Sequence, residues 1–427
     1  MMAWRAKVPL DDWRRRIATS IGAVLLALVA MTFAFAGDFA QRTFSTASVK
    51  WWWMPLFITP AIFALVAWTT QKFVSGARGS GIPQVIAASR SPTSKASAAL
   101  MSLKTGFAKL VLTIVMLFGG GSVGREGPTV QVSASIMVAV HRWLNVKLTP
   151  GVLIAGGAAG VAAAFNTPLA GIAFAIEELA AKYEQRVAIL VMGAVMIAGL
   201  VSLGISGDYV YFGRMSGVLG VKGTLMVAPL AGVLGGLLGG LFSRVVLSHS
   251  RNRRPISATL KRYPVVTALS FGLLVAIIGV WSGGLTWGTG YEPTRALLDG
   301  KNVSEWFGPA KLAAALATTL SGTPGGIFAP SLAVGAGLGN LLTPLFPTLP
   351  GGPIILLGMI AYFVGVVRAP FTAVIIVSEA TGNHGVIMSL FATALIADWV
   401  SAWVCPTRLY HGLSEAFLPK STKTTVA

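Results

Sequence analysis

Long apolar stretches separated by short polar segments recur along the whole 427-residue chain. Four of them carry no charged residue and reach the length of about 20 residues that a bilayer-spanning helix needs. They are Ile17 to Ala36, Val187 to Ser206, Leu225 to Ser243 and Pro264 to Gly284. The remaining apolar stretches are shorter and are interrupted by Gly or Pro. The pattern predicts an all-α integral membrane protein with broken and tilted transmembrane helices.

The chain also contains two related halves. An offset of 202 residues (311 − 109) aligns Phe107 to Leu110 with Pro309 to Leu312, and Gly124 to Pro128 with Gly326 to Pro330. The same offset aligns Pro168 with Pro370 and Glu177 with Glu379. Several anchors that share one offset indicate a duplication.

The charge distribution predicts how these halves are oriented. Basic residues gather in three places, which the positive-inside rule assigns to the cytoplasm. They are the N-terminus (Arg5, Lys7, Arg14, Arg15, Arg16), an internal loop (Arg244, Arg251, Arg253, Arg254, Lys261, Arg262) and the tail (Lys420, Lys423). The basic loop follows one span after the midpoint near residues 205 to 222, so the midpoint is expected outside. Each half then crosses an odd number of times, which makes the two repeats inverted.

This pattern predicts a domain organisation in five parts. They are a cytoplasmic N-terminal segment (1–16), a first membrane repeat (17–206), an extracellular or periplasmic linker (207–224), a second membrane repeat (225–415) and a short cytoplasmic tail (416–427). A secretory signal is an alternative for the first apolar stretch, because an Arg cluster precedes it and it ends in Ala34-Phe35-Ala36. Its length, and Asp11 and Asp12 in the basic part, favour a membrane helix. We expect a multi-pass protein of the cell (inner) membrane, surrounded by the lipid bilayer.

Composition narrows the chemistry. Hydrophobic residues make up 54% of the chain and charged residues 11%, with a net charge of +19. In a soluble protein this charge would suggest nucleic acid, but here the basic residues flank membrane spans, so no nucleic-acid partner is expected. The single Cys405 and four scattered histidines show no metal-ligand spacing, so we expect no metal and no cofactor. We expect no enzyme either, because zinc-hydrolase and serine–base motifs are absent at membrane depth.

One polar segment between apolar stretches, Gly119 to Gln131, carries the strongest chemical signal. Its glycines leave backbone N–H groups uncovered, and Pro128 favours the first turn of a following helix. A helix N-terminus with bare amides attracts anions, yet Arg125 and Glu126 lie at this point. A Gly-rich turn with a solvated Arg125–Glu126 pair is the simpler interpretation of this motif alone. Inverted repeats instead bring such helix starts together at mid-membrane, so an anion site is predicted where Gly124 to Pro128 meets Gly326 to Pro330.

Two hydroxyl residues are further candidates. Ser80 lies in Gly79-Ser80-Gly81-Ile82-Pro83, a third Gly–Pro helix start. A lone Ser before a helix is ordinarily an N-cap, but beside two similar starts an anion-facing hydroxyl is a competing interpretation. Tyr410 follows the last apolar stretch and, taken alone, resembles an interfacial tyrosine.

The remaining intramembrane charges divide into structural and functional candidates. Glu126 at a helix start can occupy the anion position when ionised and vacate it when protonated, so it is a candidate proton-coupled gate. Glu177 and Glu178 end an apolar helix, where side chains of neighbouring residues point about 100° apart and only one can face the interior. Glu177 is repeated as Glu379, which suggests a structural role, whereas Glu178 aligns with Ala380 and is the better functional candidate. The repeated Lys109 and Lys311 are expected to pair with glutamates.

These residues resemble a known family. Gly79 to Pro83, Gly124 to Pro128, Phe165 to Gly171 and Gly325 to Pro330 resemble, in order and spacing, the signature segments of CLC chloride channels and transporters. The resemblance covers about residues 15 to 415 and is to prokaryotic members without CBS domains. It implies the CLC fold, in which two inverted repeats form each subunit, and a homodimer with one chloride pathway per subunit.

Several roles follow from that resemblance position by position. It implies that Glu126 is the external gating glutamate, Glu178 the internal proton glutamate, and Ser80, Tyr410 and the amides of Ile327 and Phe328 the chloride ligands. Arg125, Gly127 and Lys109 support them. A glutamate at 178 is typical of chloride/proton antiporters, and serine at 80 of chloride-preferring members. Gln84 and Ile86 replace acidic residues of a close bacterial relative, and a passive chloride channel with the same fold is the alternative.

Overall fold

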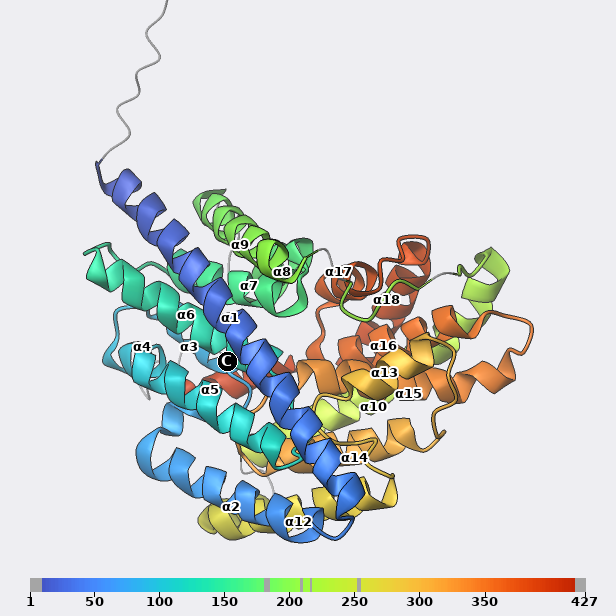
Figure 1. The fold of residues 1–427 in the computed structure, drawn as a ribbon. Coiled ribbons are helices and arrows are strands. Elements are labelled where there is room, and N and C mark those ends of the chain that lie inside the picture. Colours follow the sequence, from blue (N-terminus) through green and yellow to red (C-terminus); the bar gives the residue numbers. More distant parts are fainter. Residues whose placement is uncertain (1–9, 180–184, 208–209, 216, 252–254, 419–427) are drawn as a thin grey trace, which may run out of the picture.

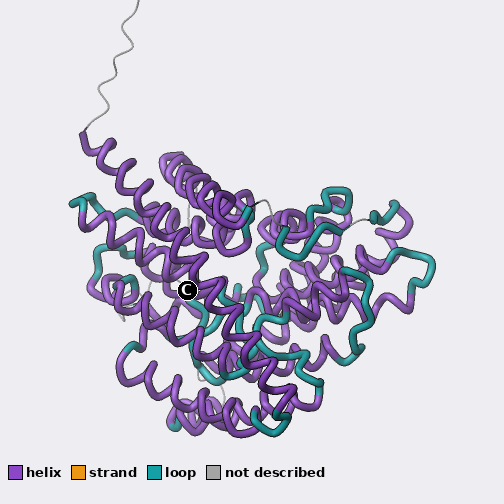
Figure 2. Tube along the Cα trace, viewed as in Figure 1, coloured by secondary structure: helices purple, strands orange, loops and turns teal. Residues whose placement is uncertain are grey.

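The structure, a computed structural model, describes residues 10–179, 185–207, 210–215, 217–251 and 255–418. This part of the chain is helical and forms no named strand (Figures 1 and 2). The helices of the first half are α1 (Leu10–Lys50), α2 (Pro55–Phe73), α3 (Ile82–Arg90), α4 (Lys95–Leu100), α5 (Leu103–Phe118), α6 (Glu126–Trp143), α7 (Pro150–Phe165), α8 (Pro168–Phe174) and α9 (Gln185–Ser206). Those of the second half are α10 (Val221–Ser250), α11 (Pro255–Arg262), α12 (Pro264–Trp281), α13 (Tyr291–Leu298), α14 (Phe307–Leu320), α15 (Phe328–Leu342), α16 (Gly351–Val367), α17 (Pro370–Thr381), α18 (Ile387–Val404) and α19 (Leu409–Ser414).

Within the described residues, seven helices are long and apolar enough to cross a membrane. All four stretches predicted from the sequence fall on such helices. Shorter apolar helices, such as α7 and α16, lie buried among them. Figure 1 shows α1 running obliquely across α5 and α6, with α2 beside α12 at one end of the molecule. The predicted mixture of continuous and broken helices is therefore confirmed.

Some predicted boundaries differ from the helix ends. The first helix starts at Leu10 rather than 17, since the polar residues before the apolar stretch continue the same helical backbone. The second half starts its first helix at Val221 rather than 225. The span that begins at Pro264 ends at Trp281, because Gly283 and Gly284 adopt positive φ and turn the chain. The first helix packs against α6, where Gly22 faces Met137, so it belongs to the membrane bundle.

The offset of 202 residues holds in the structure. Helices α6 and α15 begin at positions 126 and 328, and α8 and α17 begin at 168 and 370. The helices that precede the latter pair both end in a left-handed residue, Asn166 and Arg368, at the same offset. The equivalent helices confirm that the chain is a duplication.

A reciprocal contact joins the halves. The carboxylate of Glu177 accepts hydrogen bonds from the amides of Phe371 (3.2 Å) and Thr372 (2.7 Å) at the start of α17. At the equivalent positions, Glu379 accepts from Leu169 (3.3 Å) and Ala170 (2.9 Å) at the start of α8. Each half thus caps a helix of the other, which is an isologous contact and requires a two-fold relation. The protein is an all-α membrane protein of two inverted repeats, as the sequence predicted.

The same contact explains why each repeat carries a glutamate at this position. Amides in the first turn of a helix have no partner inside that helix, and no water satisfies them inside a membrane bundle. A carboxylate supplies acceptors of the favourable charge at that end. The structural role predicted for Glu177 and Glu379 is therefore confirmed.

Six of the basic residues used to predict orientation lie outside the described residues: Arg5, Lys7, Arg253, Arg254, Lys420 and Lys423. Most of the predicted tail lies outside them too. The orientation of the chain in the membrane stays a prediction.

Removing one of the reciprocal caps should destabilise the fold without altering the site. We expect Glu379→Ala to lower the free energy of unfolding by about 2 kcal/mol, because two hydrogen bonds to a charged group are lost and the amides at the start of α8 are left unpaired. Glu177→Ala should cost more, since Glu177 also accepts a bond from the Thr372 hydroxyl (2.8 Å). The midpoint of thermal unfolding in detergent measures both. The exposed Glu305 provides a matched control, Glu305→Ala, and equal midpoints for all three variants would contradict the role of the caps.

Candidate functional site

Three helix starts converge at the centre of the molecule. Gly124 and Gly326, which are equivalent positions of the two repeats, form an isolated antiparallel bridge in which each amide donates to the other's carbonyl at 2.7 Å. The helices α6 and α15 begin two residues after these glycines. The amide of Gly325 donates to the carbonyl of Gly79 (3.1 Å), which brings the start of α3 to the same place. The predicted convergence of the glycine–proline segments is confirmed.

Glycine is required at this junction because backbones approach each other closely. A Cβ atom on Gly326 would lie 2.9 Å from the Gly124 carbonyl oxygen and 3.0 Å from Pro128. A Cβ on Gly127 would lie 3.1 Å from the carbonyl oxygen of Ser80 and would meet its hydroxyl. The backbone contact at 326 is closer than a Cβ tolerates, and a Cβ at 127 would have to displace the Ser80 hydroxyl, so the junction favours glycine at both positions.

Glu126, the first residue of α6, lies inside this junction with its side chain 1% exposed. Its carboxylate lies against Gly124 and faces its own amide and the amide of Ala329 in the first turn of α15. Neither carboxylate oxygen makes a hydrogen bond of regular geometry to the described residues. The carboxylate therefore occupies a position where two helix N-termini offer partial positive charge.

Arg125 is also buried, so the solvated Arg125–Glu126 pair is wrong as an interpretation. Its guanidinium donates to Asp38 Oδ1 and to the carbonyl of Ala34, both at 2.6 Å, and so ties the start of α6 to α1. Sequence reasoning missed Asp38 as the partner. The available signal was an acidic residue two positions after the uncharged apolar stretch that ends at Ala36.

The predicted anion ligands lie around the same junction. Ser80 and Tyr410 are buried, their hydroxyls lie within interaction range of each other, and neither makes a regular hydrogen bond to the described residues. The ring of Phe328 stacks on Tyr410 with centroids 6.3 Å apart and so fixes its position. Ile327 and Phe328 lie at the N-terminus of α15, where amides have no intrahelical acceptor. The structure thus places Ser80, Tyr410, Ile327 and Phe328 together with Glu126.

Lys109 has a different partner from the one predicted. Its ammonium donates to the carbonyls of Ala77 (2.7 Å) and Gly79 (2.5 Å), and Lys311 donates to those of Thr286 (2.9 Å) and Gly288 (2.7 Å). The predicted pairing with glutamates is wrong, because the loops before α3 and α13 turn their carbonyls toward the lysines. These bonds supply donors to loop carbonyl groups at membrane depth, where no lipid group satisfies them.

Gln84, in α3, binds the same loop as Lys109. Its amide group donates to the carbonyls of Gly76 (3.2 Å) and Arg78 (2.5 Å). A neutral amide therefore donates hydrogen bonds to carbonyl groups at this position, whereas an ionised carboxylate has no donor. Ile86 is packed in the apolar core at 3% exposure.

Glu178 is fully buried, whereas its neighbour Glu177 reaches the start of α17. The two side chains diverge as expected for adjacent helical residues, although this turn, Ala175–Leu179, is a π-helix. Glu178 Oε1 lies 3.3 Å from Nδ1 of His411, and Arg408 and Glu177 are the other charged groups within interaction range. Sequence reasoning missed His411, since a single histidine after the last span carries no spacing signal.

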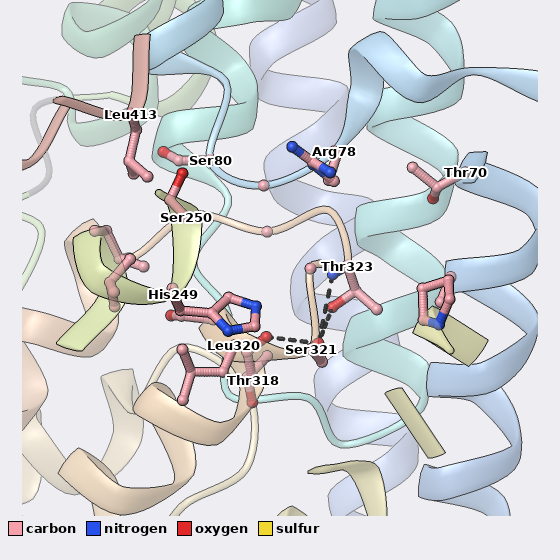
Figure 3. A pocket seen from close by; sticks show the side chains of 18 of the residues that line it. Thr70, Arg78, Ser80, His249, Ser250, Thr318, Leu320, Ser321, Thr323 and Leu413 are labelled. Atoms are coloured by element: carbon pink, nitrogen blue, oxygen red, sulfur yellow. Dashed lines mark hydrogen bonds between the residues drawn. The ribbon is translucent and has the colours of Figure 1, made fainter. Parts of the chain in front are cut away.

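Two cavities approach Glu126 from different sides. The first, about 320 Å³, extends from Ser80 and Ile327 to the basic residues Arg78, His249 and Lys261 (Figure 3). Hydroxyl residues such as Ser321 and Thr323, which are hydrogen-bonded to each other, line it as well. The second, about 450 Å³, is bordered by Arg125, Asp38 and Arg42. Glu126 lies between them, on neither wall.

Different helix segments border the two cavities. Helix α2 starts just after α1 ends, and Arg42 near that end borders the second cavity. Thr70 and Gln71, in the last turns of α2, border the first. The 19 residues of α2 span about 28 Å, and its last turns border the first cavity but not the second.

A buried polar junction beside two cavities, in a bundle of helices able to span a membrane, is typical of a membrane transport protein. The sequence profile described as "Voltage gated chloride channel" matches residues 62–402. The chain belongs to this family, which consists of channels and transporters and not of enzymes.

Known relatives agree with this assignment. The chain is 30% identical, over 393 residues, to the H(+)/Cl(-) exchange transporter ClcA of Klebsiella pneumoniae subsp. pneumoniae, covering 86% of this chain and 80% of that protein. The ClcA proteins of Salmonella agona and Salmonella typhi match with the same identity and coverage.

Solved structures share the fold. A slow cyanobacterial Cl-/H+ antiporter superposes with a TM-score of 0.82 at 23% identity, over 96% of this chain and 99% of that one. A CLC-type fluoride/proton antiporter superposes with a TM-score of 0.77 at 22% identity, over 94% and 97%. A eukaryotic CLC transporter gives 0.75 at 23% identity, over 95% of this chain and 74% of that one.

The central glycine bridge yields a direct test. We expect Gly326→Ala to reduce chloride flux in proteoliposomes by more than about tenfold, because closing the junction depends on two backbones in contact and sub-ångström misplacement is costly at such sites. The matched control is Gly193→Ala, since a Cβ there meets no atom within 4 Å and should leave flux unchanged. Normal flux in Gly326→Ala protein would show that the bridge is dispensable.

Proposed function

We propose that this chain is a secondary active transporter that exchanges chloride for protons across the membrane. The observation that supports it best is the carboxylate of Glu126, buried between two cavities and beside the amides of two helix starts. The relatives named as H(+)/Cl(-) exchange transporters support the same conclusion.

Glu126 acts in this proposal as the external gate. An ionised carboxylate and a chloride ion compete for the same amides, because both are anions attracted to helix N-termini. Protonation removes the charge of the carboxylate and its attraction to the site. The side chain then leaves, chloride takes its place, and each proton that reaches Glu126 is tied to chloride movement.

The chloride ligands in this proposal are the hydroxyls of Ser80 and Tyr410 and the amides of Ile327 and Phe328. Hydroxyl and amide donors replace the hydration shell of an anion without adding a full positive charge, which allows both binding and release. The cavity that ends at Ser80 supplies the route. Among the described residues its wall has three basic side chains and no acidic one, which concentrates anions there.

Glu178 acts in this proposal as the internal proton acceptor. It is fully buried and lies on a different segment from the anion ligands, so protons and chloride take separate inner routes. The hydroxyl of Tyr410 lies within electrostatic range of both Glu178 and Glu126. This arrangement supports a proton path that joins the two carboxylates near the anion site.

We also propose a homodimer in the cell (inner) membrane with both termini in the cytoplasm. In a single chain α9 exposes large apolar side chains, among them Ile189, Met196 and Leu200. Lipid and a second subunit are both suited to cover such faces.

Paired flux measurements test the proposal against a passive chloride channel. With protein reconstituted in liposomes, a chloride gradient alone is expected to drive protons uphill, recorded with a pH electrode alongside a chloride electrode. Chloride movement without any proton movement would establish the channel instead. No chloride movement would overturn both alternatives.

Replacing the gate should uncouple the two ions. We expect Glu126→Gln to abolish proton movement while chloride still flows, because the amide is neutral at every pH and no longer competes with the anion as a charge. The chloride flux of this variant should also lose its dependence on external pH. Persistent uphill proton movement would contradict the role of Glu126.

Replacing the internal acid should have a narrower effect. We expect Glu178→Gln to retain chloride flux and to lose chloride-driven proton uptake, since a glutamine side chain accepts no proton near neutral pH. The adjacent Glu177→Gln is the control: it weakens the cap on α17 and should lower the unfolding midpoint while proton coupling persists. If coupling survives in Glu178→Gln protein, another group is the internal acceptor.

A further inference from the structure

The fully buried carboxylate of Glu178 lies beside a partly exposed histidine. His411, in the short helix α19, places Nδ1 3.3 Å from Glu178 Oε1, and its side chain is 33% exposed whereas that of Glu178 is 0% exposed. The two residues are 233 positions apart (411 − 178), so only the fold brings them together. We propose that His411 carries protons between the aqueous phase and Glu178. This inference rests on the proposed function of Glu178.

The 3.3 Å approach fits a relay because imidazole has two nitrogen atoms, and a small side-chain movement would turn it into a hydrogen bond of regular geometry, which it is not in this structure. When a proton moves from water to Glu178, it first forms a bond with Nε2 of His411. The proton on Nδ1 then leaves and forms an O–H bond with the Glu178 carboxylate. The ring starts and ends neutral, with the proton moved from one nitrogen to the other, and rotation or tautomer exchange restores it. Histidine changes charge near neutral pH more readily than any other unperturbed side chain, so both directions are accessible.

The other charges around α19 do not take this role. Arg408 donates to the backbone carbonyl of Glu177 at 3.3 Å, and Glu415 is paired with Arg251 at 3.0 Å. Helix α3, which packs on α19, has a single charged residue, Arg90, exposed at its end, and α16 has none. Helix α10 also packs on α19, and its basic residues are Lys222, Arg244 and His249. Among the described groups, His411 is the titratable side chain in contact with Glu178 on the exposed side.

The lining of the first cavity also separates the His411–Glu178 pair from the anion route. His411 is absent from the wall of the cavity that ends at Ser80, although its neighbours Leu413, Ala416 and Phe417 border that cavity. A proton delivered through His411 therefore enters beside the chloride route and not through it. The adjacent residue, Tyr410, lies at the anion site, so α19 would link both routes.

A purely structural role is the competing explanation, in which His411 only holds the Glu178 side chain by a hydrogen bond. Glutamine separates the two explanations, because its amide donates a hydrogen bond but relays no proton. Alanine with added buffer separates them further, because a diffusible imidazole replaces a missing relay but not a missing structural contact.

The experiment measures chloride-driven proton uptake in proteoliposomes for the native protein, His411→Gln and His411→Ala. We expect both variants to lower the coupled proton rate by at least about tenfold, since positioned acid–base groups accelerate proton transfer by roughly 10² to 10⁴. The ratio of chloride to protons moved should rise accordingly. Adding L-histidine, whose charged backbone groups keep it from crossing the bilayer, to the side that His411 faces should restore a dose-dependent part of the rate in His411→Ala protein.

Two comparisons keep the outcomes distinct. His384→Gln is the matched control, because His384 bonds Ser378 (3.0 Å) and touches none of the site residues, so its proton rate should equal that of the native protein. Glu178→Gln protein should lose proton uptake and gain nothing from L-histidine. A native proton rate in both His411 variants, or a loss in His411→Ala that L-histidine does not restore, overturns the relay while leaving Glu178 in place. Coupling retained in Glu178→Gln overturns the proposed function itself.

Discussion

The fold depends on how backbone groups are satisfied where helices break inside the membrane. Unpaired N–H and C=O groups are costly without water, and this protein resolves that cost by pairing the two halves with each other. Gly124 and Gly326 exchange their amide bonds, and Glu177 and Glu379 each cap a helix of the opposite repeat. The lysines at 109 and 311 satisfy carbonyls of neighbouring loops. Each device occurs twice because the chain is duplicated.

The site arises where this symmetry is broken. At equivalent positions, one half has Glu126 and the other Phe328. Both begin a helix whose amides face the centre, so both contribute partial positive charge there. The glutamate adds an acceptor that titrates, whereas the phenylalanine adds a ring that stacks on Tyr410. At the next pair, Glu178 aligns with Ala380, and again only the first half carries the titratable group. In the proposed function the symmetric scaffold binds the anion, and the departures from symmetry supply the proton chemistry.

Much of this was predictable because the duplicated motifs are local. Glycine–proline helix starts and an offset of 202 residues are visible in the chain, and they predicted the inverted repeats, the convergence of Gly124 with Gly326 and the structural role of Glu177. The predictions that failed concern the interaction partners of charged side chains. The expected glutamate partners of Lys109 and Lys311 are backbone carbonyls, and the expected solvated partner of Arg125 is replaced by Asp38 on α1. A carbonyl has no letter of its own in a sequence, so its availability as an acceptor follows only from the path of the loop.

The sequence by itself determined the membrane class, the duplication and the residues whose chemistry is unusual at membrane depth, because hydrophobic length, glycine spacing and isolated charges are local properties. Only the tertiary structure decided which groups meet. The pairs Arg125–Asp38 and Glu178–His411 join residues from distant helices, and the position of Glu126 between two cavities depends on the packing of helices from both repeats. Contact at a distance of a few ångströms is set by how the helices pack, and helix packing has no linear signature in the chain.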